Sequence, residues 1–147
     1  MEHKDNTTKL WNSKTGECKL TLTGHSGRLG QCDLILTGHS EEVTSLCVVG
    51  DGCLASGSWD KTIKIWNTGT GQCNLTITGH NRGVTALCKV RDGLVASGSY
   101  DKTIKIWNTE TGQCNLTLTG HSRGVYALCV LGDGRMASGS EDKTIKI

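Results

Sequence analysis

The sequence contains no proline and no phenylalanine, and its only aromatic residues are four tryptophans and two tyrosines among 147 residues. No apolar run approaches the roughly 18 residues that a membrane-spanning helix needs. The net charge is only +2, whereas nucleic acids and membrane surfaces attract strongly or locally cationic chains. The first residues, Met1–Asp5, are followed by no apolar core of the secretory type. We therefore expect no nucleic-acid or membrane partner and a cytoplasmic protein, with the nucleus as the alternative.

The cysteines are numerous but form no C-x-x-C pair, which excludes the basic unit of zinc ribbons and dithiol redox motifs. Two sets recur every 41 residues: Cys32, Cys73 and Cys114, and Cys47, Cys88 and Cys129. Cysteine is a small apolar residue when reduced. We therefore interpret the eight cysteines as free thiols that fill repeated buried positions, and we expect no metal and no cofactor.

The same period of 41 residues organises most of the chain into three copies of one unit, at 37–77, 78–118 and 119–147, the third being shorter. The first two copies differ at only 11 of 41 positions. Repeats of this length are typical of modular folds in which neighbouring units stack.

Within each copy the hydrophobic residues alternate with a period of two. Cys73, Leu75 and Ile77 alternate with polar residues, as in a strand with one wet face. Asp-Gly pairs at 51–52, 92–93 and 133–134 are strong hairpin signals. The pattern predicts four short antiparallel strands per copy, an all-β fold and no helix.

Four strands per copy, Gly-His near one end and Trp-Asn after a DKTIKI segment together resemble the WD-repeat β-propeller family. The resemblance covers 37–147 and is carried by Gly38-His39, Gly79-His80, Gly120-His121 and the segments SGSWDKTIKIWN at 56–67 and SGSYDKTIKIWN at 97–108. It implies four-stranded blades, with strands of the first copy beginning at Val43, Leu54, Lys61 and Gln72.

The first 36 residues depart from this pattern. Asp5–Asn12 matches a third strand and Glu17–Thr23 a fourth strand, and Gln31–Thr37 looks like a second copy of the fourth. The first two Gly-His pairs lie only 14 residues apart, at His25 and His39. We predict that 1–36 forms a partial blade after an internal deletion. About three blades make an incomplete ring, so we expect that two copies of the chain could close a six-bladed one.

The resemblance also implies a polar network in each blade that joins the Gly-His imidazole, a serine, an aspartate and a tryptophan. A hydrolase triad is the alternative use of serine, histidine and aspartate. However, the chain has no G-x-S-x-G motif, and a catalytic site is rarely repeated in every unit. We therefore predict a structural network and no enzyme. Its members are His39, Ser56, Asp60 and Trp66; His80, Ser97, Asp101 and Trp107; and His121, Ser138 and Asp142.

Function is expected where the copies differ, on loops that the resemblance places at the top face of the propeller. Arginine and aromatic residues dominate binding hot spots. We predict a non-catalytic scaffold that binds other proteins or peptides through this face. The alternatives are a fragment of a larger WD-repeat protein, such as a ubiquitin-ligase substrate receptor or a sensor, and an enzyme. The predicted binding residues are Glu41, Glu42, Thr44, Trp59, Arg82, Thr85, Tyr100, Arg123, Tyr126 and Glu141.

Overall fold

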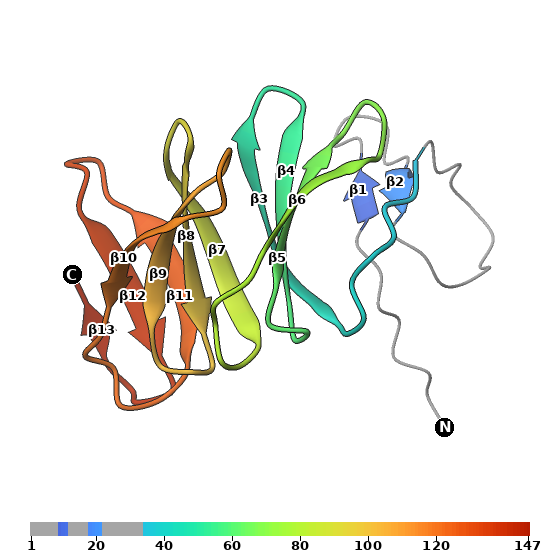
Figure 1. Cartoon of the computed structure of the whole chain (residues 1–147). Coiled ribbons are helices and arrows are strands. Elements are labelled where there is room, and N and C mark those ends of the chain that lie inside the picture. Colours follow the sequence, from blue (N-terminus) through green and yellow to red (C-terminus); the bar gives the residue numbers. More distant parts are fainter. Residues whose placement is uncertain (1–8, 12–17, 22–33) are drawn as a thin grey trace.

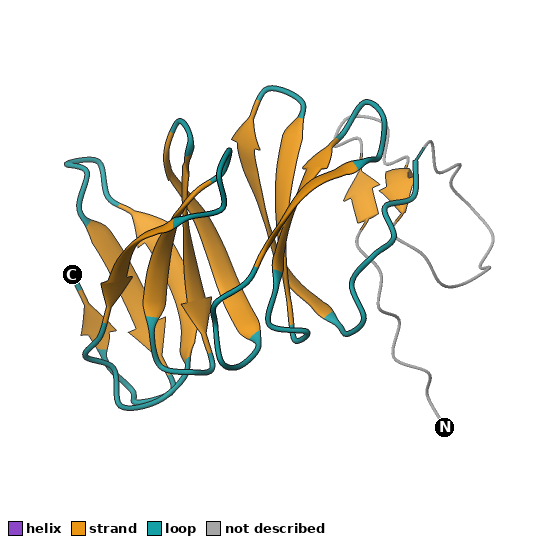
Figure 2. Cartoon of the chain, in the orientation of Figure 1, coloured by secondary structure: helices purple, strands orange, loops and turns teal. Residues whose placement is uncertain are grey.

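Three antiparallel sheets arranged side by side form the body of the protein. The computed structural model describes residues 9–11, 18–21 and 34–147, and within these it contains strands and no helix (Figures 1 and 2). No helix of the described part could therefore cross a membrane. The strands are β1 (Lys9–Trp11), β2 (Cys18–Thr21), β3 (Val43–Gly50), β4 (Cys53–Ser58), β5 (Ile63–Asn67), β6 (Cys73–Ile77), β7 (Val84–Arg91), β8 (Leu94–Ser99), β9 (Ile104–Asn108), β10 (Cys114–Leu118), β11 (Val125–Val130), β12 (Met136–Ser140) and β13 (Ile145–Lys146).

Each repeat folds into one sheet whose strands follow one another as a meander. The first sheet has the order β3-β4-β5-β6, the second β7-β8-β9-β10 and the third β11-β12-β13. The registers repeat as well: Leu46 opposes Ser56 in the first sheet, and Leu87 opposes Ser97 in the second. Identical alternation of apolar and polar residues imposes an identical register, because a slip of one residue would turn the buried side chains to solvent.

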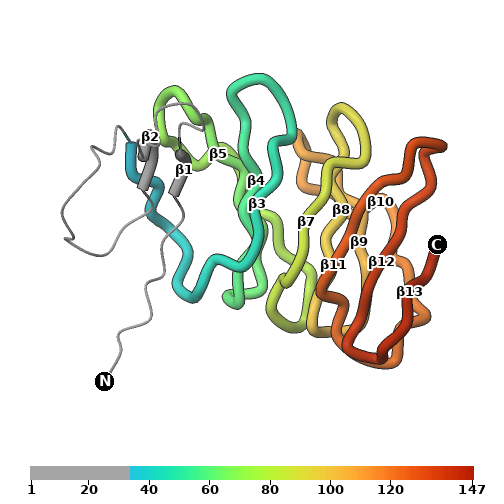
Figure 3. The backbone as a smooth tube through the Cα atoms, turned by 180° about the vertical axis from the view of Figure 1, so that it is seen from behind, coloured from blue at the N-terminus to red at the C-terminus, as the bar shows by residue number. Residues whose placement is uncertain are grey.

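The sheets pack through their first strands. β3 lies against β7, and β7 lies against β11, as the view from behind shows (Figure 3). Two glycines in the second strands allow this approach. A Cβ at Gly57 would lie 2.7 Å from Val84, and one at Gly98 would lie 2.8 Å from Val125. Both valines are fully buried, so the sheets interlock at these points.

The expected starts of the strands hold to within one residue except for one systematic difference. The third strand begins at Ile63 rather than Lys61. Lys61 has a φ of +71°, and its N–H donates to the carbonyl of Ser58 at 3.1 Å. The Asp-Lys segment is therefore a tight turn, which delays the start of the strand; the same conformation recurs at Lys102 and Lys143.

The prediction that the cysteines occupy buried positions is wrong for several of them. Cys73, Cys114 and Cys129 are exposed, and Cys47, Cys53 and Cys88 are half-buried. Cys73 and Cys114 lie on the outermost strands, which have a neighbour on one side only. All six are free thiols, and Cys32 lies outside the described residues.

The N-terminal hairpin repeats the register of the outer strands in the two complete sheets. In β1 and β2, Trp11 opposes Cys18 and Lys9 opposes Thr21. In β9 and β10, Trp107 opposes Cys114 and Lys105 opposes Thr117 in the same way. The backbone thus pairs these two segments in the register of a third and a fourth strand. That residues 1–36 form a partial blade stays a prediction.

The segment expected as a duplicated fourth strand is not a strand where it is described. Residues 34–37 have no ladder partner, and 31–33 lie outside the described part. Leu36 is nevertheless 3% exposed and packs with Leu54 and Trp66. Its apolar side chain is therefore retained in the core of the first sheet without strand pairing.

Candidate functional site

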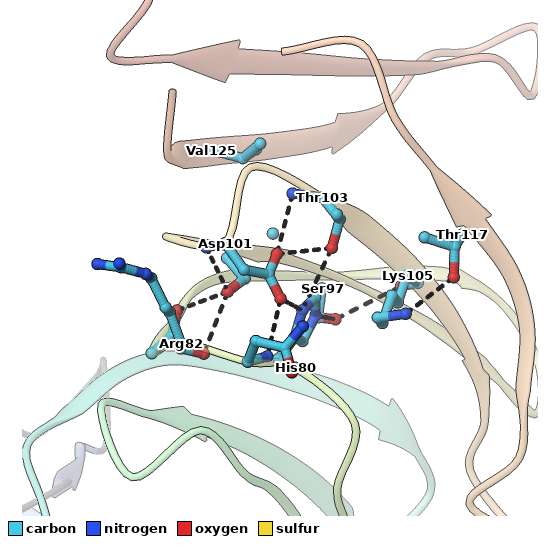
Figure 4. Close-up of polar contacts among 12 residues, drawn as sticks. His80, Arg82, Ser97, Asp101, Thr103, Lys105, Thr117 and Val125 are labelled. Atoms are coloured by element: carbon cyan, nitrogen blue, oxygen red, sulfur yellow. Dashed lines mark hydrogen bonds and ion pairs between the residues drawn. The ribbon is translucent and has the colours of Figure 1, made fainter. Parts of the chain in front are cut away.

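A chain of hydrogen bonds runs through the second sheet and is drawn in Figure 4. The imidazole of His80 contacts Asp101 through Nδ1 at 2.8 Å and Ser97 through Nε2 at 2.7 Å. The indole Nε1 of Trp107 donates to the same Ser97 hydroxyl at 2.7 Å. The four predicted members of this network are thus brought together.

An indole N–H can only donate, so the Ser97 oxygen accepts from Trp107. The Ser97 proton has two acceptors within reach, His80 Nε2 at 2.7 Å and the Lys105 carbonyl at 3.5 Å. With a neutral imidazole, Nε2 accepts from Ser97 and Nδ1–H donates to Asp101. Each buried polar group is satisfied, as buried polar groups usually are.

Asp101 closes the chain and is itself fully occupied. One carboxylate oxygen accepts from His80 and from the N–H of Asn81, at 2.8 and 3.0 Å. The other accepts from the N–H and the hydroxyl of Thr103, at 3.0 and 2.6 Å. The carboxylate therefore ties the Gly-His loop to the turn that precedes β9.

The network is repeated in the other two sheets. In the first, His39 contacts Asp60 and Ser56, each at 2.7 Å, and Trp66 donates to Ser56 at 2.7 Å. In the third, His121 contacts Asp142 at 2.8 Å and Ser138 at 2.9 Å. The repeated geometry follows from the repeated sequence.

Burial and hydrogen bonding move the pKa values of these groups. Burial lowers the pKa of His80 and of His39 below 6.5, although Asp101 and Asp60 oppose the shift. Burial alone would raise the pKa of Asp101, but its hydrogen bonds with Thr103, His80 and Asn81 outweigh that effect and hold the pKa at about 2. The histidines are thus neutral and the aspartate is charged near pH 7.

Serine, histidine and aspartate are in contact here as they are in a hydrolase triad, but the serine is inaccessible. Ser97 and Ser56 are 0% exposed, and each hydroxyl already accepts from a tryptophan. A nucleophilic serine needs an open approach for the carbonyl it attacks. The arrangement therefore joins loops and strands and offers no access to a substrate. No group of three metal-ligating side chains occurs in the described part of the chain.

Four of the 11 positions at which the first two repeats differ, 40, 41, 42 and 59, lie on loops at one end of the sheets. We call the surface formed by residues 40–42, 59–61, 81–83, 100–102, 122–124 and 141–143, together with the adjoining side chain of Tyr126, the top face. Backbone hydrogen bonds join its loops: Trp59 donates to the carbonyl of Glu42, and Tyr100 to that of Gly83, each at 3.0 Å. Neighbouring loops are therefore held at fixed positions.

Three predicted aromatic residues form a row on this face. The rings of Trp59 and Tyr100 have centroids 5.7 Å apart, and those of Tyr100 and Tyr126 are 6.2 Å apart. Both pairs are inclined, at 59° and 72°, as aromatic pairs prefer. Tyr126 remains 46% exposed. Each ring belongs to a different repeat, so the row crosses all three sheets.

Two glycines whose role the sequence does not reveal support the row. A Cβ at Gly83 would lie 2.1 Å from the Trp59 ring, and one at Gly124 would lie 2.9 Å from the Tyr100 ring. Each ring therefore rests on the bare backbone of the next loop. The signal was present in the copies, since glycine occupies 83 and 124 where the first repeat has Glu42.

The predicted charged residues flank the row. The guanidinium carbon of Arg82 lies 5.7 Å from the centroid of the Tyr100 ring, which is cation–π geometry. Arg123 and Glu141 form an exposed ion pair at 3.3 Å. Glu41 is exposed and Glu42 is half-buried. The first repeat thus has two glutamates, the second has Arg82, and the third has both Arg123 and Glu141.

Two predicted binding residues have a different place. The hydroxyl of Thr44 donates to the carbonyls of Gly57 and Val84, at 3.0 and 2.5 Å. Thr85 donates to the carbonyls of Gly98 and Val125 in the same manner. Each threonine bridges its own sheet to the next one, so we assign both to the contact between sheets. Tyr126 occupies the equivalent position in the third repeat.

A cavity of about 490 Å³ opens on the top face between the second and third sheets. The sequence did not single out Lys102, which lines it and is exposed. The positive φ of 75° at this residue is a consequence of the tight turn. The lining residues are Asn81, Arg82, Tyr100, Asp101, Lys102, Ser122, Arg123, Gly124 and Glu141.

Comparison with known proteins agrees with this repeated geometry. The family profile "WD domain, G-beta repeat" (WD40) matches residues 30–67, 71–108 and 112–147. The chain is 32% identical over 66 residues to the guanine nucleotide-binding protein subunit beta of Schizosaccharomyces pombe (strain 972 / ATCC 24843), covering 44% of this chain and 17% of that protein. The crystal structure of the WD40 β-propeller domain of Doa1 superimposes with a TM-score of 0.79 and 30% identity, covering 95% of this chain and 42% of that one. The chain thus spans less than half of either relative.

Proposed function

Because this chain belongs to the WD40 repeat family, whose propellers are general protein-interaction scaffolds, we propose that it is a non-catalytic scaffold that binds a protein or peptide through its top face. The observation that carries the proposal is the aromatic row. Three rings from three repeats meet on one surface, at positions where the repeats otherwise differ. Aromatic residues and arginine contribute most of the binding energy in protein interfaces.

The pattern of variation supports the same surface. The histidine–serine–aspartate part of the buried network is the same in each sheet, whereas the top-face residue before the turn aspartate changes from Trp59 to Tyr100 to Glu141. A scaffold needs the buried network residues for packing, whereas the variable top-face residues are available for recognition of a partner. The rings of Trp59 and Tyr100 also pack on glycine backbone, and backbone hydrogen bonds hold the loops that carry them, which reduces the entropy lost on binding.

Affinity capture with the purified chain tests this proposal. We expect the proteins retained by the unaltered chain to be lost when Trp59→Ala and Tyr100→Ala are combined. Leu116→Ala is the matched control, because Leu116 is an apolar residue 50% exposed on the outer strand β10, away from the top face. An unchanged set of captured proteins with the double variant would contradict the proposal, provided that the variant retains its β-sheet circular dichroism.

We also propose that a second copy of the chain pairs with the open third sheet. This sheet has three strands where its neighbours have four, and Ile145 of its last strand is 77% exposed. Unpaired edges of this kind readily accept another strand. The missing fourth strand would be donated by Gln31–Thr37 or Glu17–Thr23 of a second copy. Strand β2 of the latter has the register of a fourth strand against β1, so it would exchange β1 for β13 of the other chain.

Light scattering measures the outcome directly. We expect a molar mass near twice the chain mass of 15.7 kDa, and we expect deletion of residues 1–23 to reduce it to one chain mass. A well-folded monomer of the full sequence would contradict this proposal and leave the top-face proposal unaffected.

A further inference from the structure

The cavity between the second and third sheets differs in charge from the equivalent place between the first and second. Three cations line it, Arg82, Lys102 and Arg123, against the two carboxylates of Asp101 and Glu141. At the preceding junction Glu41 stands where Arg82 stands here, and Arg82 stands where Arg123 stands here. The cavity between the second and third sheets therefore has two arginines where the preceding junction has one at the equivalent positions.

The two carboxylates, Asp101 and Glu141, differ in whether they contact the cations of the cavity directly. All four hydrogen-bonding positions of Asp101 are occupied by His80, Asn81 and Thr103, and Figure 4 shows the Arg82 side chain extending away from that carboxylate. Glu141 holds only Arg123, in an ion pair whose side chains are 64% and 42% exposed. Such exposed pairs contribute little and exchange partners readily.

Tyr100 adds a wall to the cavity. Its ring rests on Gly124 and carries the Arg82 guanidinium at 5.7 Å. A guanidinium held over a ring keeps its planar edge free for two parallel hydrogen bonds to a carboxylate or phosphate. Arg82 and Arg123 thus approach the cavity from adjacent loops, with the lysine of the intervening turn beside them.

From this arrangement we propose that the cavity receives an acidic side chain of the bound peptide, a carboxylate or a phosphoryl group, between Arg82 and Arg123. The incoming group replaces Glu141 as the partner of Arg123. The inference rests on the proposed top-face function and specifies the chemistry of its ligand. Tyr100 contributes aromatic contact to the same peptide.

Three fluorescein-labelled peptides test the proposal. They share one 12-residue sequence of glycine, serine, leucine and one tyrosine, and their central residue is glutamate, phosphoserine or glutamine. We expect both acidic peptides to bind at least about 10-fold more tightly than the glutamine peptide by fluorescence anisotropy. Preference for phosphoserine over glutamate would identify a phosphoryl ligand, and equal affinity a carboxylate ligand.

Variants locate the acidic group. We expect Arg82→Ala and Arg123→Ala each to weaken binding of the acidic peptides about 10-fold and to leave the glutamine peptide unchanged. Arg82→Lys keeps the positive charge but loses the two parallel donors of the guanidinium. Its affinity for the acidic peptides should therefore lie between that of the unaltered chain and that of Arg82→Ala. Glu141→Gln should tighten acidic peptides, because it releases Arg123. Arg91→Ala and Arg135→Ala, at exposed arginines outside the cavity, are the controls and should have no effect.

The failure of this inference is distinguishable from that of the proposed function. Equal affinity for all three peptides, no binding of the acidic ones at about 1 mM, or equal losses with all four alanine variants would overturn the inference. If the capture experiment still depended on Trp59 and Tyr100, the top face would remain a binding surface with a ligand of different chemistry.

Discussion

At the scale of single residues, glycine decides where the sheets can meet. Gly57 and Gly98 lie on second strands, at the points where Val84 and Val125 of the next sheet pack against the backbone. Neither glycine is required by its φ angle; each is required by the neighbour. The repeated Ser-Gly-Ser segment thus has a packing reason that no strand propensity would predict, since glycine weakens strands.

This interpretation predicts that the same glycine-to-alanine substitution lowers the free energy of unfolding by different amounts in the three repeats. Gly57→Ala and Gly98→Ala should each lower the free energy of unfolding by about 1–3 kcal/mol, as overpacking does. Gly139→Ala should be nearly neutral, because its Cβ would meet only Ala127 at 3.4 Å. Urea unfolding followed by tryptophan fluorescence measures all three, and equal effects at the three positions would contradict the explanation.

At the scale of the element, the polar network holds each four-stranded sheet to the loop that enters it. The bonds cross from the Gly-His loop to the second strand, the turn and the third strand. Its stability depends on protonation, because a neutral imidazole accepts from Ser97 whereas a protonated one donates from both nitrogens. Protonation of His80 would therefore turn two donors toward each other unless the serine hydroxyl rotates away.

The pKa shifts fix the direction of the pH dependence. His80 and His39 have folded pKa values below 6.5, so the unfolded chain binds protons first and the stabilisation is lost as the pH falls below about 6.5. Asp101, with a pKa of about 2 against 3.8 unfolded, adds a second loss as the pH falls below 3.8. Both groups destabilise the fold in acid.

Urea unfolding at a series of pH values tests this sign. We expect the free energy of unfolding to decrease between roughly pH 7 and pH 5. The decrease should be smaller in the double variant His39→Asn/His80→Asn, which is less stable at neutral pH but lacks these imidazoles. A free energy that rises on acidification in this window would show that the histidines are charged in the folded state.

At the scale of the whole molecule, the three sheets differ in what surrounds them. The second sheet has a neighbour on each side, β3 of the first and β11 of the third. Its strand β8 is buried at five of six positions, as is β4, whereas β12 is buried at one of five. Stacked repeats derive much of their stability from such neighbour contacts.

The rate of amide hydrogen exchange should therefore differ between the three sheets, although their sequences are nearly the same. We expect amides of β4 and β8 to exchange most slowly, those of β12 faster, and those of β13 fastest, because Ile145 and Ile147 are 77% and 72% exposed. Mass spectrometry of peptic fragments provides the comparison. Equal protection of β8 and β12 would indicate that the third sheet is covered, as it is in the proposed pairing of two copies.

The sequence alone determined the repeat and the four-stranded unit, because period-two alternation and fixed spacing restrict the backbone to one register. The members of each polar network were implied by the resemblance to the WD-repeat family. The sequence could not show that Thr44 and Thr85 lie between sheets and not on the binding surface. Each hydroxyl donates to one carbonyl of its own repeat and to one carbonyl of the next repeat, and the second contact exists only in the folded structure. Nor could the sequence reveal the exposed cysteines of the outer strands, whose burial depends on what lies beside the sheet. Only the packing of one sheet on another brought Trp59, Tyr100 and Tyr126 into a row and left a cavity lined by cations beside it. The physical reason is that contacts between repeats depend on how neighbouring sheets are arranged, which the sequence of one repeat does not specify.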